Sequence, residues 1–595
     1  MKKYWKSLDE LKDIQEGPGL QKEVEPEFSI EGLTETEVSN KMKSSRRDFL
    51  KFLGFSVGTA ALASSCEQPV RKAIPYLAQP EEVTPGMANH YASTFFDGHD
   101  YCPVVVKVRD GRPIKIEGNT LSKITDGGTN ARVQASVLNL YDSARLPYPM
   151  KNGERSDWAT IDGEIKTQLD AIAAKEEKIV ILSSSVISPS TLQVFEEFKA
   201  TYPTAEVVYY DTVSFSAIRM ANKETFGRPA IPSYRFDKAE VIVGFNADFL
   251  GTWLSPVEFS NQYAKTRELN EKKKSLSKHY QFESTMSLTG SNADIRMSIK
   301  PSNELTVLLN IYNIIAAKSD MPTFSADTSP VNIDNVAEDL LHHQGKGLVV
   351  SGTNDVYIQA VVNAINFLLG NLGGTFNFER NLLSKKGCDQ KVDKLISDMN
   401  GGSVGAILLY NVNLAYDYPE AEKFLSGLGK VGLSISFNEV NDESTKLVTY
   451  ACPDHHYLES WGDAEPYSGM YSLQQPTIRP IFNTRQVQDS LMKWAGIDTE
   501  YKDYIKNYWE NNLFGAQDKY FTFTDFWNHT LQEGVYVKEL EVEACPLYDF
   551  EFLGKNANKL KAEKPEGIEL IVYEKIGIGT GLYANNPWLQ ELPDP

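Results

Sequence analysis

Short apolar runs alternate with stretches of helical spacing along the chain from about residue 157 onward. The runs 179–182, 207–210 and 241–245 have the composition of strands buried on both faces, whereas 161–173 and 192–201 place apolar residues at helical spacing. Buried strands that alternate with helices predict a parallel sheet covered by helices on both faces.

The same alternation returns in a second block, from about residue 306 to 496. Strands are predicted at 348–350, 406–410 and 431–435. A long helical pattern over 355–369 is closed by Gly370, a residue suited to the end of a helix. The sequence therefore predicts a multidomain α/β fold with parallel sheets.

Several predicted strands run into asparagine or glycine. Asn246 follows the strand 241–245, and Asn413 follows the strand 406–410. Open α/β sheets bind ligands at the carboxyl ends of their strands, so both asparagines are candidates to line a crevice. The alternative is ordinary turn chemistry, because neither segment is a glycine-rich phosphate loop.

The two ends of the body differ from its α/β centre. Residues 104–119 predict two strands joined at Asp110-Gly111, a strong hairpin signal. The last hundred residues contain aromatic clusters, one predicted strand at 568–573 and weak periodicity, which indicates a smaller mixed or β domain.

A length of 595 residues suggests about four domains. The boundaries that we expect are an N-terminal extension (1–40), an export signal (41–66), a small β-rich domain (67–120), a discontinuous α/β domain (121–175 with 336–496), an inserted α/β domain (176–335) and a C-terminal mixed domain (497–595).

Residues 45–51 predict a twin-arginine export signal. The motif places Arg46 and Arg47 before Phe49 and Leu50, and a weakly apolar stretch with several glycines follows it. That stretch is shorter than the ~20 residues that span a bilayer. The alternative is an amphipathic helix with two adjacent arginines.

Small residues then precede Cys66, as in the lipobox of bacterial lipoproteins. Leu62 lies four positions before the cysteine rather than the commoner three, so an unmodified cysteine is an equal alternative.

Charge and cysteine content exclude several functions. The net charge of −20 repels nucleic acid and anionic lipid head groups. The five cysteines are scattered, so no zinc, haem-attachment or ferredoxin motif exists. The pairs His342-His343 and His455-His456 point in divergent directions, which favours surface or capping histidines over metal ligands.

Several segments together resemble a known family. They are the KYW-x-SL-x-EL start, the Asp110-Gly111 hairpin, 134–149, 236–257, 366–373, 438–445, 452–463 and the ending 584–595. This set is similar to the molybdopterin oxidoreductase superfamily, and with the N-terminal extension it resembles the large subunits of alternative complex III, a bacterial membrane quinol-oxidising complex.

The resemblance implies a non-catalytic, molybdopterin-oxidoreductase-like half that lacks molybdopterin. A ferredoxin-like half with iron–sulfur clusters would follow Pro595 or form a separate chain. The other partners it implies are a multi-haem c-type cytochrome, integral membrane quinol-binding subunits and a possible terminal oxidase. It also implies a peripheral or lipid-anchored position on the periplasmic face of the bacterial inner membrane.

Two departures from the catalytic pattern support the loss of cofactors. Cys102 alone remains where active relatives carry a cysteine motif, and Asn413-Leu414 replaces Asn-Pro. One thiolate cannot hold a four-iron cluster. The rival interpretations are a molybdopterin-dependent catalytic subunit, with a pterin near Asn246 and Asn413, and a free-standing binding lipoprotein.

The hypothesis that the protein is exported and acylated at Cys66 predicts the first residue of the mature chain. Mass spectrometry of the protein isolated from membranes should find a lipid-modified Cys66 as its first residue. An intact Met1 or an unmodified Cys66 would contradict acylation.

Overall fold

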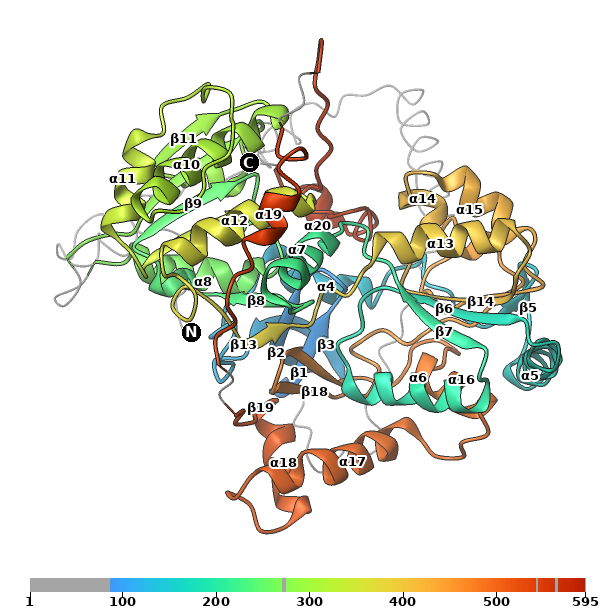
Figure 1. Ribbon diagram of the computed structural model, residues 1–595. Coiled ribbons are helices and arrows are strands. Elements are labelled where there is room, and N and C mark those ends of the chain that lie inside the picture. Colours follow the sequence, from blue (N-terminus) through green and yellow to red (C-terminus); the bar gives the residue numbers. More distant parts are fainter. Residues whose placement is uncertain (1–85, 270–273, 542–543, 562–564, 594–595) are drawn as a thin grey trace, which may run out of the picture. The chain divides into compact units, whose positions relative to one another are not determined.

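The computed structural model describes residues 86–269, 274–541, 544–561 and 565–593. The export residues Arg46, Arg47, Phe49 and Leu50, together with Cys66, lie outside this range. The described residues form one compact unit that contains four sheets (Figure 1). In the part of the chain that is described, no helix combines the length and apolarity needed to cross a membrane.

The largest sheet has seven strands in the order β5-β4-β16-β15-β14-β6-β7. The strands are β4 (Met150–Lys151), β5 (Glu154–Arg155), β6 (Lys178–Ser183), β7 (Ala205–Tyr209), β14 (Val404–Tyr410), β15 (Leu433–Ser436) and β16 (Tyr450–Ala451). The five strands from β16 to β7 are parallel, and β4 and β5 add an antiparallel edge.

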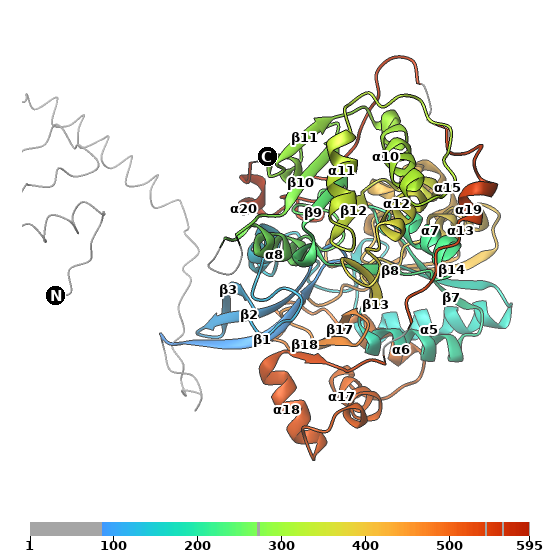
Figure 2. The same ribbon diagram turned by 60° about the vertical axis from the view of Figure 1, so that its left-hand side comes forward.

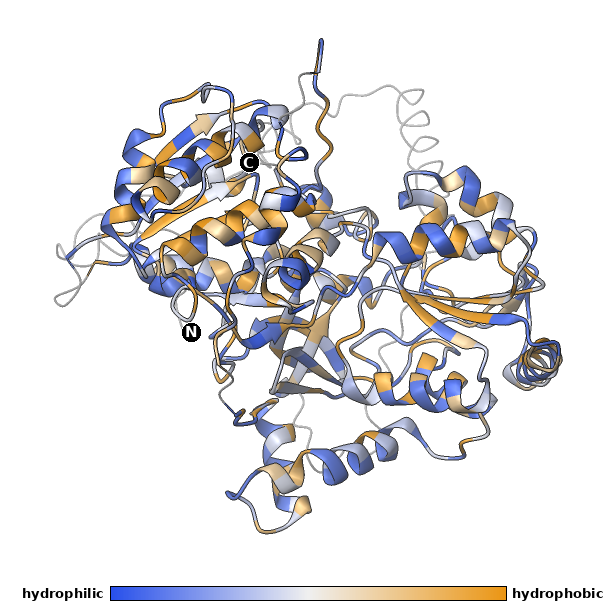
Figure 3. Cartoon of the chain, in the orientation of Figure 1, coloured by the Kyte–Doolittle hydropathy of each residue, from blue (hydrophilic) through white to orange (hydrophobic). Residues whose placement is uncertain are grey.

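Alternation along β6 explains why helices cover both faces of this sheet. Ile179 and Ile181 belong to one apolar cluster and Val180 and Leu182 to another, because successive side chains of a strand point to opposite faces. The first cluster includes residues of α5 (Trp158–Ala174), α6 (Pro189–Thr201) and α16 (Val487–Trp494), and the second includes α13 (Asp389–Asn400) and α15 (Ala421–Leu428). In Figure 3 the strands of this sheet are mostly hydrophobic (orange), and the helices beside them carry both hydrophobic (orange) and hydrophilic (blue) residues.

A second parallel sheet has the order β11-β10-β9-β12. Its strands are β9 (Val241–Phe245), β10 (Lys278–Glu283), β11 (Ile295–Ser298) and β12 (Gly347–Ser351). Its helices are α8 (Pro256–Arg267), α10 (Glu304–Lys318), α11 (Asp334–His342) and α12 (Val356–Leu368). In Figures 1 and 2, α11 and α12 lie beside β9 and β12.

The strand pairing corrects the expected boundaries of the two α/β domains. Strands β6 and β7 fall in the range 176–335 assigned to the inserted domain, yet they pair within the sheet of β14. Conversely, β12 lies in 336–496 but pairs with β9. Apolar runs predict that strands exist, but they carry no information about which of two parallel sheets a strand joins.

Two antiparallel sheets complete the fold. One consists of β1 (Ala88–Phe96), β2 (Tyr101–Arg109) and β3 (Arg112–Gly118). Asp110 and Gly111 both have positive φ, as a type I′ hairpin turn requires, so the predicted hairpin is confirmed. The other has the order β19-β18-β17-β13-β8. Its strands are β8 (Ile231–Tyr234), β13 (Phe376–Leu382), β17 (Gly462–Tyr467), β18 (Met470–Gln474) and β19 (Val535–Val537).

The C-terminal hundred residues extend the existing core. Trp509 of α17 (Tyr501–Asn512) and Phe526 of α18 (Phe523–Glu533) are fully buried in the cluster that also packs on the seven-stranded sheet. The predicted strand at 568–573 is wrong. Ile568, Leu570 and Val572 are 100%, 87% and 88% exposed, and no described strand edge pairs with this segment.

A buried arginine joins distant parts of the chain. Arg132, in α4 (Ala131–Asn139), donates from Nε and Nη2 to the Asp100 carboxylate at 2.6 and 3.0 Å. It also donates to the carbonyl oxygens of Ile576 (2.6 Å) and Gly251 (3.3 Å). Burial opposes ionisation of Asp100, but the guanidinium overcomes it and holds the pKa of that carboxyl below its usual range.

Substitution Arg132→Ala should destabilise the protein strongly, because it leaves the Asp100 carboxylate buried without its counter-ion. We expect a loss of about 3–5 kcal/mol, measured as a shift of the urea unfolding midpoint. Arg235→Ala is the matched control, since Arg235 pairs with Asp237 near the surface, and it should cost about 1 kcal/mol or less. Equal losses for the two variants would contradict this role.

Candidate functional site

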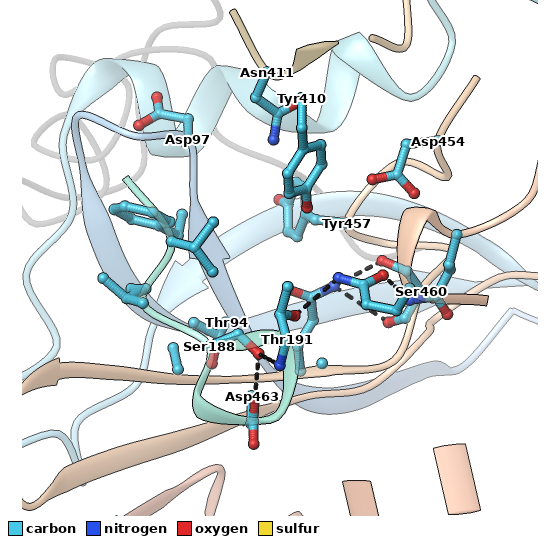
Figure 4. A pocket seen from close by; sticks show the side chains of 18 of the residues that line it. Thr94, Asp97, Ser188, Thr191, Tyr410, Asn411, Asp454, Tyr457, Ser460 and Asp463 are labelled. Carbon is cyan, nitrogen blue, oxygen red and sulfur yellow. Dashed lines mark hydrogen bonds between the residues drawn. The ribbon is translucent and has the colours of Figure 1, made fainter. Parts of the chain in front are cut away.

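A cavity of about 140 Å³ lies at the carboxyl edge of the seven-stranded sheet (Figure 4). It is bordered by the residues that follow β6, β14, β15 and β16, and by the ends of β1 and β17. The chain goes from β6 to β7 on one side and from β14 to β15 on the other. The cavity therefore lies at the topological switch point, where open α/β sheets bind ligands.

Backbone geometry sets the floor of this cavity. The Ser184 amide donates to the carbonyl oxygen of Tyr410 at 3.1 Å, which joins the ends of β6 and β14. Asn411 then turns the chain away with a φ of 53°, a conformation that asparagine tolerates better than most residues. Ser188 caps α6 by accepting from the Thr191 amide, so the helix begins directly at the cavity wall.

Among the residues that the structure describes, four carboxyl groups line the cavity, and no lysine or arginine does. They are Asp97, Glu439, Asp454 and Asp463. Asp463 accepts hydrogen bonds from the hydroxyls of Ser188 and Ser190 and from the Trp509 indole, and it thereby positions α6 and α17. Asp97 accepts a hydrogen bond from the Tyr583 hydroxyl.

Burial makes two of these groups titrate near neutral pH. It raises the pKa of Asp454 to about 7, although the amides of His455 and Val487 donate to this carboxyl. Burial also raises the pKa of Glu439 to about 8, against the attraction of Arg145, whose Nε lies 3.4 Å from Glu439 Oε2. Arg145 is already paired with Glu459 at 2.6 Å. The cavity is therefore acidic and able to hold protons.

Of the histidine pair beside the cavity, His455 is half-buried and His456 is buried, so of the two expected positions, surface or capping, the surface does not apply to His456. His456 is buried, and burial lowers its pKa well below the usual value. Burial likewise lowers the pKa of His455, a lining residue, to about 4. His455 Nδ1 lies 2.6 Å from the Thr484 hydroxyl, whereas His456 Nδ1 accepts from the Leu458 amide. The rings diverge, as predicted.

The two predicted crevice asparagines lie outside the cavity and in different sheets. Asn413 is two residues beyond Asn411, and its side chain bonds Glu443 and Ser444. Asn246 ends β9 with a φ of 48° and donates to Glu304 Oε2 at 2.7 Å. The structure therefore does not bring Asn246 and Asn413 together in one site.

Glu304 fills the switch point of the second sheet. Its carboxylate accepts from Asn246 Nδ2, from the Ser351 hydroxyl at 2.7 Å and from the Thr353 hydroxyl at 2.6 Å. These donors lie at the carboxyl ends of β9 and β12, the neighbours between which the chain order reverses. Glu304 is 1% exposed, so a carboxylate of the chain itself takes the place where such sheets hold a ligand's anionic group.

The cysteines offer little metal chemistry. Burial raises the pKa of the Cys102 and Cys452 thiols to about 12, so both stay protonated, whereas the metal ligand would be a thiolate. Cys452 is fully buried, with an exposure of 0%. Within residues 86–593, as far as they are described, no group of three or more His, Cys, Asp or Glu residues is arranged to hold a metal ion.

No protein-family model matches the chain. The menaquinone reductase, molybdopterin-binding-like subunit, of Nitratidesulfovibrio vulgaris (strain Hildenborough) is 22% identical over 458 residues, which cover 69% of this chain and 65% of that protein. The match spans less than two thirds of the relative's own length. Acetylene hydratase from Pelobacter acetylenicus superimposes with a TM-score of 0.56 at 13% identity, over 76% of this chain and 74% of that chain.

This chain has the molybdopterin oxidoreductase fold. The expectation of an α/β, molybdopterin-oxidoreductase-like fold is confirmed.

The residues at the two switch points do not fit the cofactor of this fold. A molybdopterin carries a phosphate, which proteins hold with backbone amides, lysines and arginines. Here the first crevice presents four carboxyl groups and a neutral histidine, and its volume is below the ~300–1,000 Å³ typical of ligand pockets. In the second crevice, Glu304 already uses the hydrogen-bond donors.

Asp454→Asn should change the pH dependence of stability. In the folded state Asp454 keeps its proton up to about pH 7, whereas in the unfolded chain it releases the proton near pH 4. The contribution of Asp454 to the free energy of unfolding therefore falls as pH rises from about 4 to 7. The variant lacks this decline. Its free energy of unfolding relative to wild type should therefore rise between pH 5 and pH 8, by at most about 1.4 kcal/mol for each unit by which the pKa is raised, and thermal unfolding at each pH measures this difference.

Asp157→Asn is the control for this titration. Asp157 caps α5 at the surface, and hydrogen bonds from the Thr160 amide and hydroxyl lower its pKa, so it stays ionised from pH 5 to 8. The difference between Asp157→Asn and wild type should stay constant over that range. A constant difference for Asp454→Asn as well would show that Asp454 titrates normally.

Proposed function

We propose that this chain is a non-catalytic structural subunit of a quinone-linked membrane respiratory complex of the alternative complex III type. The observation that carries the proposal is the acidity of both crevices: the fold is that of a redox enzyme family, yet its switch points present carboxyl groups. The relative from Nitratidesulfovibrio vulgaris, named a molybdopterin-binding-like subunit of menaquinone reductase, supports the same role.

In this role the chain carries no molybdopterin and no cluster, and it docks the subunits that transfer electrons. Those partners are a ferredoxin-like iron–sulfur half or subunit, a multi-haem c-type cytochrome and integral membrane quinol-binding subunits, with a possible terminal oxidase. Electrons would pass from quinol to a periplasmic acceptor. Export through the twin-arginine motif, and attachment by Cys66 or by partners, would place the subunit on the periplasmic face of the inner membrane.

The rival function is that of a catalytic subunit of a molybdopterin-dependent oxidoreductase. The fold itself favours it, because other proteins with this fold bind the cofactor. It requires that an anionic pterin displace or neutralise the carboxyl groups at the switch points.

Composition of the native complex distinguishes the two functions. The complex purified from membranes should contain iron and c-type haem, but no molybdenum, no tungsten and no pterin, measured by elemental analysis and by fluorescence of an oxidised acid extract. A molybdopterin enzyme produced in the same cells serves as the positive control. One molybdenum or tungsten and a fluorescent pterin per chain would establish the catalytic rival instead.

A further inference from the structure

A second cavity, of about 400 Å³, lies apart from both crevices. It is bordered by β7, by α7 (Ser216–Phe226), by β8 and β13, and by the segment that leads into α13. Figure 1 shows α7 and β8 beside β13, which the pairing of β8 with β13 confirms. Its volume equals that of about thirteen water molecules and falls in the range of small-ligand pockets.

The walls of this cavity are largely apolar. They are formed by Val207, Tyr209, Ile231, Leu382 and Leu383, together with the chain at 229–230. Such a surface would cover the hydrocarbon part of a ligand and release the water in contact with it. The apolar wall alone would suit any hydrophobic molecule, so the charged residues decide which chemistry the cavity selects.

In the described part of the chain, no acidic residue lines the cavity and four basic residues do: Arg219, Lys385, Lys386 and Lys391. Arg219 Nη1 donates to the carbonyl oxygens of Lys386 (2.6 Å) and Gly387 (3.2 Å). Lys386 Nζ donates to the Val186 carbonyl at 2.8 Å, and Lys385 Nζ to that of Gly98 at 2.7 Å. Within the described chain none of the four forms an ion pair with a carboxylate. Neutral carbonyls hold Arg219, Lys385 and Lys386, and Lys391 is exposed.

Two further groups at the cavity are suited to contact a ligand. Burial lowers the pKa of Lys386 to about 8, and Arg219 adds to this effect while Glu465 and Asp211 oppose it. The side-chain oxygen of Asn381, which also lines the cavity, is buried and accepts no hydrogen bond. A ligand with an acidic head and a donor group such as a hydroxyl would satisfy both.

We propose that this cavity binds an amphipathic organic anion, with a phosphate or carboxylate head between Arg219, Lys386 and Lys391 and an apolar body against Ile231, Leu382 and Leu383. The shared chemistry is that of a soluble organic phosphate or carboxylate and of an anionic lipid head group. In a chain of net charge −20, this concentration of uncompensated positive charge is local and selects for an anion.

Cys388 provides a reporter inside the cavity, because its half-buried thiol is a lining residue. Alkylation by iodoacetate, an anion, is compared with alkylation by neutral iodoacetamide, and peptide mass spectrometry resolves each cysteine. The rate with iodoacetate divided by the rate with iodoacetamide should be at least about threefold higher at Cys388 than at Cys545. Cys545 is exposed and lies outside the cavity. Equal ratios at the two cysteines would overturn the proposal.

Ligand binding is then measured on the full chain as protection of Cys388 from iodoacetamide. Octyl phosphate should protect at lower concentration than either inorganic phosphate or octanol, since only octyl phosphate uses both the cations and the apolar wall. If octanol protects as well as octyl phosphate, the cations do not contribute to binding. If inorganic phosphate protects as well as octyl phosphate, the apolar wall does not contribute. Either result contradicts an amphipathic ligand.

Variants assign the head group to the cations. Lys386→Met and Lys391→Met should each weaken protection by octyl phosphate by about fivefold or more and lower the iodoacetate preference at Cys388. Lys391 is exposed, so its substitution tests the site even if Lys386→Met unfolds. Lys423→Met, which removes a cation paired with Glu420 on α15, is the matched control and should change neither readout.

Vesicles distinguish the source of the anion. Protection of Cys388 by vesicles of phosphatidylglycerol, but not by vesicles of phosphatidylcholine, assigns the cavity to a membrane lipid. Protection by octyl phosphate alone assigns it to a soluble ligand. The absence of protection by every one of these anions would refute the site.

Discussion

The fold depends on one buried cation that cannot lose its proton. An arginine side chain stays charged in proteins, so Arg132 must find acceptors wherever the chain buries it. It finds them in the loop after β1, in the turn after β9 and in the C-terminal segment. Arg132 thereby fixes the positions of these three regions relative to one another, which non-directional apolar packing alone would not do. The Asp100 carboxylate stays ionised although it is buried.

Parallel sheets impose a second constraint, because the carboxyl ends of their strands leave polar backbone groups at one edge. Open α/β sheets commonly bind ligands at such edges. Here the chain completes both edges itself: Glu304 accepts the donors at one, and carboxyl and hydroxyl groups close the other around a small cavity. Chains that share a strand order can thus differ in the few side chains that occupy the strand ends.

The sequence predicts the strands well because they are apolar on both faces, and it predicts the α/β class for the same reason. The site is harder to predict. Asn411 and Asn413 are separated by one residue, and only the backbone turn decides which faces the cavity. Glu304 lies 58 positions from Asn246, so no local pattern links them. The segment 568–573 is apolar except for Glu569, as a strand can be, but composition cannot supply the neighbouring strand that would pair with it.

The last residues of the chain complete the first layer of the fold. Tyr583 and Leu589 belong to the apolar cluster of β1, β2 and β3, and Asn586 donates to Asn139, 447 positions earlier. Such contacts form late, because closing loops of this length costs conformational entropy before any contact compensates for it. During synthesis the sheet of β1, β2 and β3 therefore stays incomplete until residues 583–589 have left the ribosome, although its own three strands were made several hundred residues earlier.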